Sequence, residues 1–176
     1  MKFIRLTDKT DEKYQNSMKY YRESFPHNEQ RRQEAQDNIM SDDEYHFNLI
    51  VEDGTEVGNI LFWENDQYRY VEHFYIYPQF RGRSYGSKAI QTLCGMGKQV
   101  ILEIEPAVDE MTIRRKGFYE RNGFCANSYH YTHPPFYKEL EDYELTVMSF
   151  PEKLSQEEFE GFCRYIREHI MSSSNV

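Results

Sequence analysis

The chain has 176 residues, of which 39% are apolar, 29% are charged and 16% are aromatic. At roughly 150 residues per domain, this length predicts one compact domain over residues 1–176, and the apolar content excludes intrinsic disorder for most of it. The 21 basic and 30 acidic residues give a net charge of −9, which repels nucleic-acid phosphates and anionic lipid heads. A neutral or cationic small partner suits this charge better than a nucleic acid or a membrane.

The lack of a recognisable targeting signal and the pattern of the cysteines both favour a cytoplasmic location. No apolar run approaches the roughly 20 residues that span a bilayer, and the first residues, MKFIRLTDKTDE, become charged before a signal-peptide core could form. Cys94, Cys125 and Cys163 form neither a CxxC pair nor a Cys/His ligand spacing, which argues against a disulfide framework and a structural zinc site. We therefore expect a soluble cytoplasmic protein without a bound metal.

One strand, two helices and a hairpin are predicted first along the chain. Residues 2–7 alternate apolar and polar as a half-buried strand does, and 8–24 and 27–41 have the spacing or composition of helices. Residues 45–51 and 57–63 are rich in β-branched and aromatic residues. The Asp-Gly pair between these two runs supplies the left-handed backbone of a tight turn, so they predict a hairpin.

A strand, a turn, a helix and another strand follow. Residues 67–77 are dense in aromatic and β-branched residues and end at Pro78, which cannot continue a ladder. Small and apolar residues at helical spacing predict a helix over 86–97, and 100–105 has the composition of a buried strand. Because the helical connection returns the chain in the same direction, the two strands should pair in parallel.

A helix and two strands are predicted after this unit. Helical spacing runs over 106–122, with Pro106 in the first turn and Gly123 just past the end. Strands are expected at 124–131 and 143–150 because both runs carry β-branched and aromatic residues. The order of elements predicts an α/β fold, with a central mixed sheet that contains a parallel strand pair and is flanked by helices.

The C-terminal segment 151–171 predicts a helix that docks on the domain. It opens with the capping-box pair Ser155 and Glu158 and continues with apolar residues along one face. Residues 172–176 are expected to form a frayed tail.

The turn over 81–86 is the first candidate site, because it connects a strand to a helix. Backbone N–H groups at a helix start, together with Arg81 and Arg83, suit a bound diphosphate. Gly82 and Gly86 could equally serve only to allow a tight turn. The segment has neither the GxGxxG spacing of a dinucleotide site nor the GxxxxGK[ST] spacing of a P-loop.

Two motifs, taken in order, resemble those of one family. Residues 75–86 are YIYPQFRGRSYG, and 117–124 are GFYERNGF. They are similar to the motifs of the GNAT superfamily of acyl-CoA-dependent N-acetyltransferases, whose first motif is matched by Arg81, Ser84 and Gly86. The resemblance covers roughly residues 2–150, and it implies a GNAT-like fold whose parallel strand pair is splayed.

The resemblance implies acetyl-CoA as cosubstrate. The pantetheine arm of acetyl-CoA would pair with the main chain of Tyr75, Ile76 and Tyr77 as if with another strand. Lys88 would help to neutralise the charge of the diphosphate. The diphosphate would be held by the backbone amides and side chains of Arg81, Gly82, Arg83, Ser84, Tyr85 and Gly86.

Three residues depart from the family pattern. Ser84 stands where glycine is usual, so its amide would approach phosphate less closely, although the hydroxyl could itself donate. Thr112 and Arg115 stand where many members have Asn and Ala, so a CoA contact made by that asparagine has no counterpart here.

Tyr119 is the residue that the resemblance places beside the leaving thiolate as general acid. A phenol suits this task because it is neutral at pH 7 and can donate a proton. The family transfers the acetyl group by direct attack of a neutral amine, without an acyl-enzyme. From the residues alone, Tyr119 would be interpreted as a core aromatic of an amphipathic helix.

The general base is left open among three residues. Glu72 is the first choice and His73 an alternative, and since consecutive strand residues point to opposite faces, at most one of them should face the pocket. Glu105, which shares a face with Glu103, is the other alternative, at the carboxyl end of a strand where α/β sheets bind ligands. A cross-strand ion pair of Glu72 and helix capping by Glu105 remain equally compatible with the sequence.

Aromatic residues are the candidates for the acceptor site. They could line an apolar pocket with hydroxyls that orient a substrate, belong to the core, or bury against a second subunit of a homodimer. These residues are Tyr20, Tyr21, Trp63, Tyr129, Tyr131, His133, Phe136 and Tyr137. The basic run 114–116 is interpreted as a solvated helix face.

These features predict an N-acetyltransferase that moves an acetyl group from acetyl-CoA to a primary amine of a small molecule or peptide. A tRNA-directed acetyltransferase toxin is disfavoured, because such an enzyme needs a cationic face for RNA and the net charge is −9. A CoA-binding sensor or scaffold without turnover is the alternative from a different class.

Overall fold

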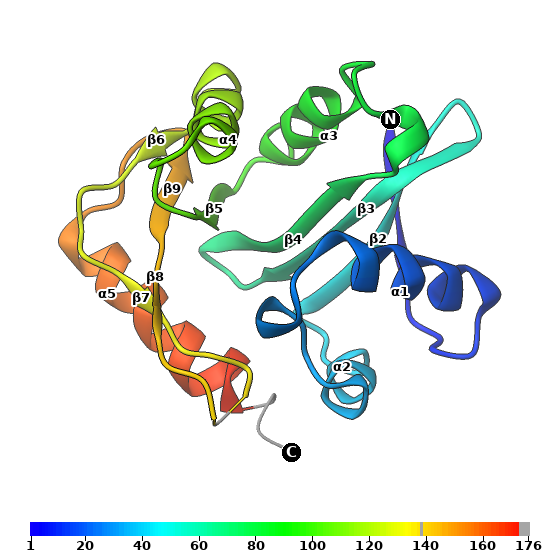
Figure 1. Cartoon of the computed structure of the whole chain (residues 1–176), viewed down its shortest axis with the longest axis horizontal. Helices are drawn as coiled ribbons and strands as arrows, with labels where there is room; N and C mark the ends of the chain where they lie inside the picture. Colours follow the sequence, from blue (N-terminus) through cyan, green and yellow to red (C-terminus); the bar gives the residue numbers. More distant parts are fainter. Residues whose placement is uncertain (138, 173–176) are drawn as a thin grey trace.

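The computed structural model describes residues 1–137 and 139–172, and it is a mixed α/β structure (Figure 1). The strands are β1 (Lys2–Leu6), β2 (Tyr45–Glu52), β3 (Thr55–Glu64), β4 (Tyr68–Ile76), β5 (Gln99–Ile104), β6 (Cys125–Ala126), β7 (Thr132–His133), β8 (Tyr143–Glu144) and β9 (Thr146–Phe150). The helices are α1 (Glu12–Ser24), α2 (Gln33–Ile39), α3 (Tyr85–Cys94), α4 (Glu110–Arg121) and α5 (Gln156–Tyr165), with 3-10 turns η1 (His27–Glu29) and η2 (Pro78–Phe80) and a π-helical segment η3 (Ile166–Ile170). Residues 173–176 of the expected tail lie outside the described residues.

Seven strands form one sheet in the order β1-β2-β3-β4-β5-β9-β6, and β7 pairs with β8 as a separate ribbon. Among the strands described, β4 and β5 are the one parallel pair of this sheet. This confirms the mixed α/β sheet with a parallel pair that the sequence predicts. In Figure 1, α3 and α4 lie on one side of the sheet, and α1 and α2 lie on the other.

The predicted hairpin forms between β2 and β3. At its tip, Asp53 and Gly54 have φ angles of 48° and 80°, the left-handed conformation that this turn requires at both positions. The register continues to Tyr45 opposite Trp63. The other edge of β3 then carries β4, so the hairpin supports the strand that leads to the candidate site.

Each face of the sheet has its own core. The face that packs against α1, α2 and α5 is aromatic, and its fully buried side chains include Tyr14, Tyr21, Phe47, Trp63 and Phe162. The face that packs against α3 and α4 is mainly aliphatic, with Ile60, Ala89, Ile90, Leu93, Val100 and Leu102. Burying a large apolar side chain stabilises the fold by about 1.5–3 kcal/mol, so these two layers hold the helices on the sheet.

The terminal helix α5 begins at Gln156, within the segment 151–171, and its N-cap is the capping-box pair that the sequence indicates. The Ser155 hydroxyl accepts from Glu158 N–H, and the Glu158 carboxylate accepts from Ser155 N–H, which completes the capping box. Phe162 and Ile166 then bury their side chains in the aromatic core. No helix among residues 1–137 and 139–172 is long and apolar enough to cross a bilayer.

The helix expected over 106–122 begins later, at Glu110. The Asp109 side chain accepts from Thr112 N–H at 2.8 Å, and the Thr112 hydroxyl in turn accepts from Asp109 N–H at 3.0 Å. This capping box sets the start of α4. Pro106 therefore lies in the loop before the helix and not in its first turn.

The helix expected over 27–41 is reduced to α2. Gln30 and Arg31 are almost fully buried, and their side chains bind α1 and β4 rather than solvent. These tertiary contacts hold the backbone at Gln30 extended, with φ of −105° and ψ of 138°. The helix-forming composition of this segment is overridden until Gln33.

The strand expected over 124–131 pairs with β9 only at Cys125–Ala126. Asn127 follows this pair, and its backbone N–H still donates to the Val147 carbonyl of β9 at 2.9 Å. Its side chain donates to Ser149 Oγ at 3.0 Å and accepts from Leu154 N–H at 2.9 Å. The chain then leaves the sheet and returns as the short ribbon β7-β8.

Candidate functional site

The parallel strands β4 and β5 pair along Tyr68–Val71 and Gln99–Leu102 and then separate (Figure 1). Beyond this point β4 continues beside β3 as far as Ile76, while β5 continues beside β9. Residues 72–76 of β4 therefore have a neighbouring strand on one side only. We call this stretch the open edge of β4.

The open edge can accept one more extended chain. Tyr77 N–H donates to β3 at 2.9 Å, so the alternation of an antiparallel ladder turns the peptide groups of Phe74 and Ile76 away from β3, toward the side that β5 has left. The Ile76 carbonyl accepts from Arg81 Nε at 3.0 Å. The side chains of Tyr75 and Tyr77 are buried on the aromatic face. The main chain is thus what this segment offers to a ligand, and Phe74 is a position that sequence reasoning missed.

The turn over 81–86 leads into α3 without a side-chain cap. Gly82 and Ser84 have φ angles of 75° and 61°, and Ser84, at the N-cap position, makes no side-chain hydrogen bond to the helix. The first N–H groups of α3 therefore lack a side-chain acceptor. Together with the exposed Arg81 and Arg83, this helix start suits an anion such as phosphate.

Gly86 and Lys88 have different surroundings in the first turns of α3. A Cβ atom on Gly86 would lie 3.5 Å from Phe118 Cζ and 3.8 Å from Ile76 Cγ1, which are ordinary contacts, so packing against α4 and β4 does not by itself require a glycine here. Lys88 forms an ion pair with Glu52, which also binds the N-terminal amine at 2.8 Å. Lys88 is therefore already neutralised, which makes it a poor candidate for a diphosphate contact.

Tyr119 is a residue of α4, and its side chain lies in the core layer that α3 and α4 cover. Its ring packs against Phe118 and Phe124, with centroid distances of 5.1 and 5.6 Å, and the residue is 9% exposed. Its hydroxyl has no hydrogen bond to another described residue. Burial raises the pKa of Tyr119 to about 12, so the phenol is neutral at pH 7 and holds a proton that it could donate.

Glu72 and His73 lie on the same face of the sheet, which corrects the expectation from strand alternation. The register with β3 shifts next to Glu72, and the extra residue forms a β-bulge. The Glu72 carboxylate accepts from Trp63 Nε1 at 3.3 Å, and the His73 ring packs against Tyr21 at 4.9 Å between centroids. Both side chains therefore face the aromatic core that packs against α1.

Glu72 forms a buried ion pair with Arg31, a residue that sequence reasoning missed. Nη1 and Nη2 of Arg31 both bind the carboxylate, Nη2 at 2.5 Å, and the two side chains are 0% and 3% exposed. Phe136 covers the guanidinium at 4.6 Å. Burial alone would raise the pKa of Glu72, but the Arg31 charge and hydrogen bonds hold it well below its usual range. Such an acidic carboxylate is a poor proton acceptor, which argues against Glu72 as the base.

Glu29 and Glu105 are the more accessible carboxylates near the open edge. His73 is buried, and its Nε2 donates to the Glu29 carbonyl at 2.9 Å. Glu29 is half-buried, and burial raises its pKa, an effect that the Glu105 charge increases and the His73 and Arg115 charges oppose. Glu105 is 43% exposed just after β5 and pairs with Arg115. Glu29 was missed because it lies in the short 3-10 turn η1, which carries no motif.

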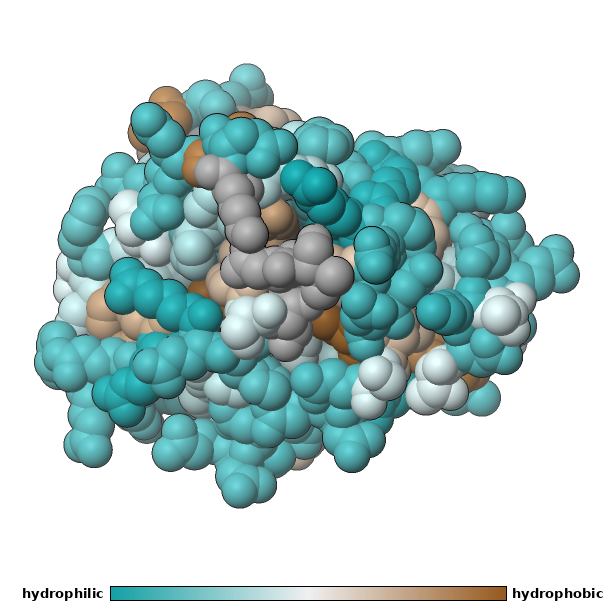
Figure 2. All heavy atoms as spheres, turned by 90° about the horizontal axis from the view of Figure 1, so that it is seen from below, coloured by the Kyte–Doolittle hydropathy of each residue, from teal (hydrophilic) through white to brown (hydrophobic). Residues whose placement is uncertain are grey.

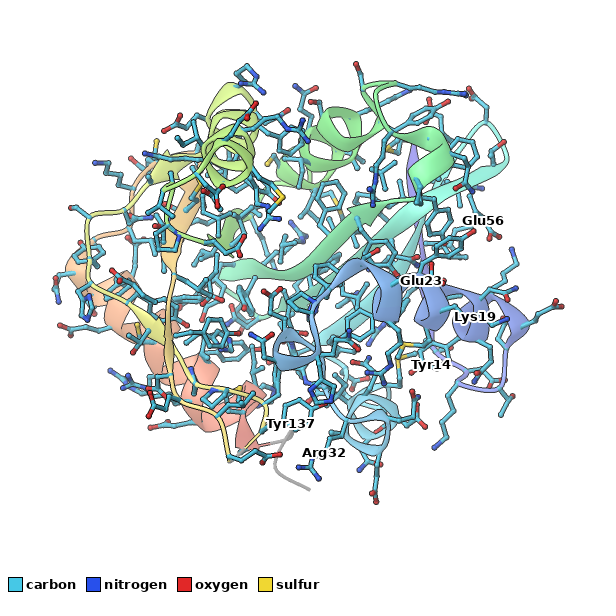
Figure 3. All side chains as sticks on the ribbon, in the orientation of Figure 1. Tyr14, Lys19, Glu23, Arg32, Glu56 and Tyr137 are labelled. Atoms are coloured by element: carbon cyan, nitrogen blue, oxygen red, sulfur yellow. The ribbon has the colours of Figure 1, made fainter. Side chains whose placement is uncertain are left out.

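Most of the aromatic residues considered for the acceptor site belong to the core. Trp63 and Tyr21 are fully buried, and Phe136 and Tyr137 nearly so. Tyr137 also lies beside Arg32, whose guanidinium is 5.1 Å from the ring centroid (Figure 3). The loop after β7 is thereby attached to the start of α2.

The end of β4 also borders a hollow of about 600 Å³. Its wall includes Tyr20 of α1, stacked on Tyr77 at 4.1 Å between ring centroids. Lys19, Glu23 and Glu56 stand around it (Figure 3). Tyr20 is thus one predicted acceptor-site aromatic that does line a hollow.

Comparisons with known proteins decide the family. The sequence model of the Acetyltransferase (GNAT) family matches residues 10–124, which include both strands of the parallel pair and the turn between them. The chain belongs to the GNAT family.

Known acetyltransferases resemble the chain to different extents. A Bacteroides thetaiotaomicron protein assigned to the GNAT acetyltransferases matches 100% of this chain and 99% of its own, with a TM-score of 0.91 and 28% identity. The ribosomal-protein-S18-alanine N-acetyltransferase of Escherichia coli shares the fold alone, with a TM-score of 0.56 and 13% identity over 89% of this chain and 96% of its own. YjbC of Bacillus subtilis, assigned as an acetyltransferase, is 37% identical over 68 residues, or 37% of this chain and 35% of YjbC. The chain thus matches about a third of that relative's length.

GNAT enzymes use acetyl-CoA, and the residues present fit such a ligand. The open edge of β4 offers main-chain groups to an extended arm, and the uncapped start of α3 offers N–H groups to a diphosphate. The two departures in α4 have other roles, because Thr112 completes a capping box and Arg115 pairs with Glu105. Among the described residues, no three His, Cys, Asp or Glu side chains are grouped as metal ligands.

Replacing Arg31 with Met should destabilise the protein by about 3–5 kcal/mol at pH 7, because Glu72 would remain buried without its partner. The pair depresses the folded-state pKa of Glu72, so its stabilisation is present at neutral pH and is lost as the pH falls below the unfolded value of about 4.3. In the variant, protonation relieves the buried charge. The difference in unfolding free energy between wild type and variant should therefore shrink toward pH 4.

Chemical denaturation at pH 7 and pH 4 measures this difference. The exposed Arg114→Met variant is the matched control and should be close to wild type at both values. An Arg31→Met penalty of equal size at both pH values would contradict the ionic account.

Proposed function

We propose that the protein is an N-acetyltransferase that moves the acetyl group of acetyl-CoA to a primary amine of a small molecule or peptide by direct attack. The observation that carries this proposal is the separation of β4 from β5. It leaves an unpaired main-chain edge beside an uncapped helix start on one side and accessible carboxylates on the other.

We assign the cosubstrate to the open edge and the turn that follows it. The peptide groups of Phe74 and Ile76 bind the pantetheine arm, and the N–H groups from Gly82 to Gly86 bind the diphosphate. Arg83 contributes charge, while Arg81 also holds the Ile76 carbonyl. Tyr75 and Tyr77 contribute through their backbone, because their side chains are buried.

The reaction needs a proton acceptor for the amine and a proton donor for the thiolate. The amine nitrogen forms a bond to the thioester carbonyl carbon, the carbon–sulfur bond breaks, and the sulfur leaves with the bonding electrons. Tyr119 donates its hydroxyl proton to this sulfur and is later reprotonated from solvent. Its pKa of about 12 keeps the hydroxyl protonated at neutral pH until the thiolate forms.

We assign the proton acceptor to Glu29, with Glu105 beside it. Glu29 is half-buried and has a raised pKa, which suits a carboxylate that must take a proton near neutral pH. Glu105, one of the sequence candidates, is partly exposed but engaged with Arg115. Glu72 and His73 are buried and occupied by Arg31 and by the Glu29 carbonyl, so we give them positioning roles.

The charge of the molecule supports an amine acceptor over a nucleic acid. The face seen in Figure 2 is largely hydrophilic, and the chain carries a net charge of −9. Such a field attracts protonated amines and repels RNA phosphates, which disfavours a tRNA substrate. Two relatives of the same fold are named for amine acceptors, a protein alanine and spermidine.

Turnover separates this proposal from a CoA-binding sensor. Incubation with acetyl-CoA and a panel of small and peptide primary amines should release free thiol many times per enzyme molecule with at least one acceptor. A thiol-reactive dye measures this release. Stoichiometric CoA binding without turnover on any amine would favour the sensor. The absence of CoA binding would exclude both the enzyme and the sensor.

Tyr119→Phe should lower kcat by about 100-fold or more, because the donor hydroxyl is lost while the apolar volume stays. Acetyl-CoA affinity and the melting temperature should change little, since the hydroxyl has no hydrogen bond to a described residue. Tyr129→Phe is the matched control, because it removes a hydroxyl that binds the Leu154 carbonyl far along the chain from the site. Full activity of Tyr119→Phe would exclude the phenol as acid.

Glu29→Gln should lower kcat/KM by about 10- to 100-fold and abolish the acidic limb of its pH profile. Glu29 accepts a proton only when it is ionised. Activity of the wild type should therefore fall as the pH drops through the raised pKa of Glu29. The pH dependence of kcat/KM measures this effect, with the exposed Glu34→Gln as control. An unchanged acidic limb in Glu29→Gln would move the assignment to Glu105.

A further inference from the structure

One guanidinium group acts on both the proposed proton donor and the proposed proton acceptor. Arg115 lies on α4, four positions before Tyr119, and side chains at this spacing are neighbours on a helix surface. Burial raises the pKa of both Tyr119 and Glu29, and the charge of Arg115 opposes this rise in both residues. Among the described residues, Arg115 is the cation whose charge reaches both groups.

Arg115 is held by one nitrogen and leaves its other donors open. Its Nη1 binds the carboxylate of Glu105, which stands just after β5, and the two side chains are 44% and 43% exposed. Its Nη2 and Nε have no hydrogen bond to another described residue. A guanidinium carries five N–H donors, so the ion pair orients the group while most of its donors remain available to a substrate.

Stability does not account for an arginine at this position. Arg115 is one of the departures from the family pattern, in which many members have alanine, so the fold does not require a charged side chain here. The ion pair with Glu105 is partly exposed, and ion pairs of this kind contribute little to stability. The arginine therefore calls for a functional explanation.

Acetyl transfer develops negative charge between the two groups that Arg115 reaches. As the amine nitrogen bonds to the thioester carbon, the π electrons of the carbonyl move onto its oxygen. They return when the carbon–sulfur bond breaks and the sulfur leaves with the bonding pair. The amine proton goes to Glu29 and the Tyr119 proton goes to the sulfur, so the thioester carbon must lie between these residues. A cation at this place stabilises the transition state more than the ground state.

We propose that Arg115 is a further catalytic residue, whose guanidinium binds the thioester carbonyl oxygen and stabilises the negative charge that develops on it. Glu105 is then a positioning residue, because it holds the guanidinium by one nitrogen. This role does not require Glu105 to take a proton. The inference rests on the acetyl transfer proposed above.

Steady-state kinetics of Arg115→Ala, measured by thiol release with an accepted amine, tests the proposal. kcat should fall about 100-fold or more, as expected for a removed oxyanion donor, while KM for acetyl-CoA changes less than about twofold. The melting temperature should change little, because the pair with Glu105 is partly exposed. Arg115→Lys keeps the charge without the planar fork and should recover part of the lost kcat.

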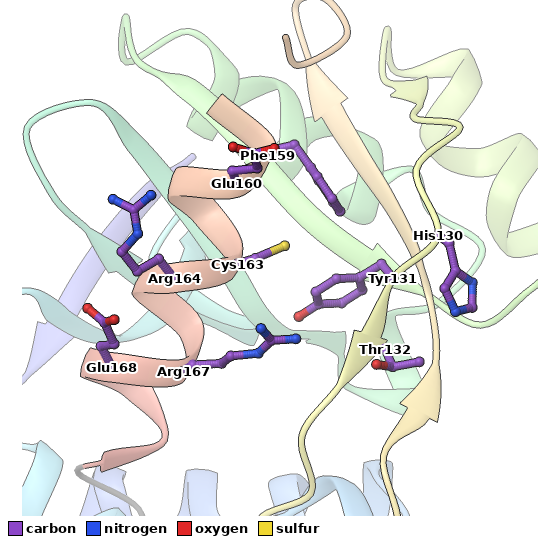
Figure 4. A pocket seen from close by; sticks show the side chains of 9 residues that line it. All are labelled: His130, Tyr131, Thr132, Phe159, Glu160, Cys163, Arg164, Arg167 and Glu168. Atoms are coloured by element: carbon purple, nitrogen blue, oxygen red, sulfur yellow. The ribbon is translucent and has the colours of Figure 1, made fainter. Parts of the chain in front are cut away.

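Two other arginines are matched controls for the loss of a positive charge. Arg114 is the exposed neighbour of Arg115 on α4, and Arg114→Ala should leave kcat unchanged. Arg164 lines a pocket between α5 and the segment that leads into β7, where it extends away from Tyr131 and Arg167 (Figure 4). Arg164→Ala should also leave kcat unchanged.

A titration of the Glu29 carboxyl by ¹³C NMR places the guanidinium without relying on turnover. The charge of Arg115 opposes the rise in the pKa of Glu29, so the midpoint should move to higher pH in Arg115→Ala. It should stay in place in Arg114→Ala. An unchanged midpoint in Arg115→Ala would show that the guanidinium is too far from the proton acceptor, and it would overturn the proposal.

Full kcat in Arg115→Ala would overturn the proposal, and so would a loss confined to KM for acetyl-CoA, which would make Arg115 a binding residue only. No recovery of kcat in Arg115→Lys would count against the charge in the same way. In each of these cases the wild type still turns over, so acetyl transfer itself stands. A wild type that releases no thiol with any amine would overturn acetyl transfer and this proposal together.

Discussion

The limited pairing of β4 with β5 is the constraint on which the rest of the site depends. Each strand is bound on its other side, β4 to β3 and β5 to β9, so the two halves of the sheet follow different twists once their shared ladder ends at Val71 and Leu102. Gly58 keeps β3 paired closely with β4 beside this edge, because a Cβ atom there would lie 2.3 Å from the Tyr75 carbonyl oxygen. The main chain of β4 thus stays in place while one of its edges becomes available, and the turn that follows carries the uncapped start of α3 to the same end of the sheet.

The buried pair of Arg31 and Glu72 fixes the opposite face of the same strand. Arg31 comes from the segment between α1 and α2, Glu72 from the bulge of β4, and Phe136 from the loop after β7. A removed partner would leave a charge in the aromatic core, so these three segments are held together cooperatively. Glu29 lies two residues before Arg31, and this anchor therefore also sets where the proposed proton acceptor stands relative to the open edge. In the segment between α1 and α2, Arg31 thus holds the position and Glu29 is the proposed proton acceptor.

Local patterns predicted much of the fold, and tertiary contacts account for what they missed. The hairpin at Asp53 and Gly54, the parallel pair around α3 and the capping box at Ser155 depend on short-range signals, and all three are confirmed. The family motifs indicated the acetyltransferase class and the turn before α3. The shared face of Glu72 and His73 was not predictable, because a bulge depends on pairing with β3. Arg31 and Glu29 were also missed, since a charged residue in a polar segment gives no sign that the fold will bury it.

A crystal structure of the protein with bound CoA tests the central claim, that the open edge of β4 and the start of α3 hold the cosubstrate. The account predicts a pantetheine arm that hydrogen-bonds to the peptide groups of Phe74 and Ile76, a diphosphate at the N–H groups of Gly82 to Gly86, and a sulfur within hydrogen-bond reach of the Tyr119 hydroxyl. CoA bound elsewhere on the surface, or with its sulfur remote from Tyr119, would contradict it.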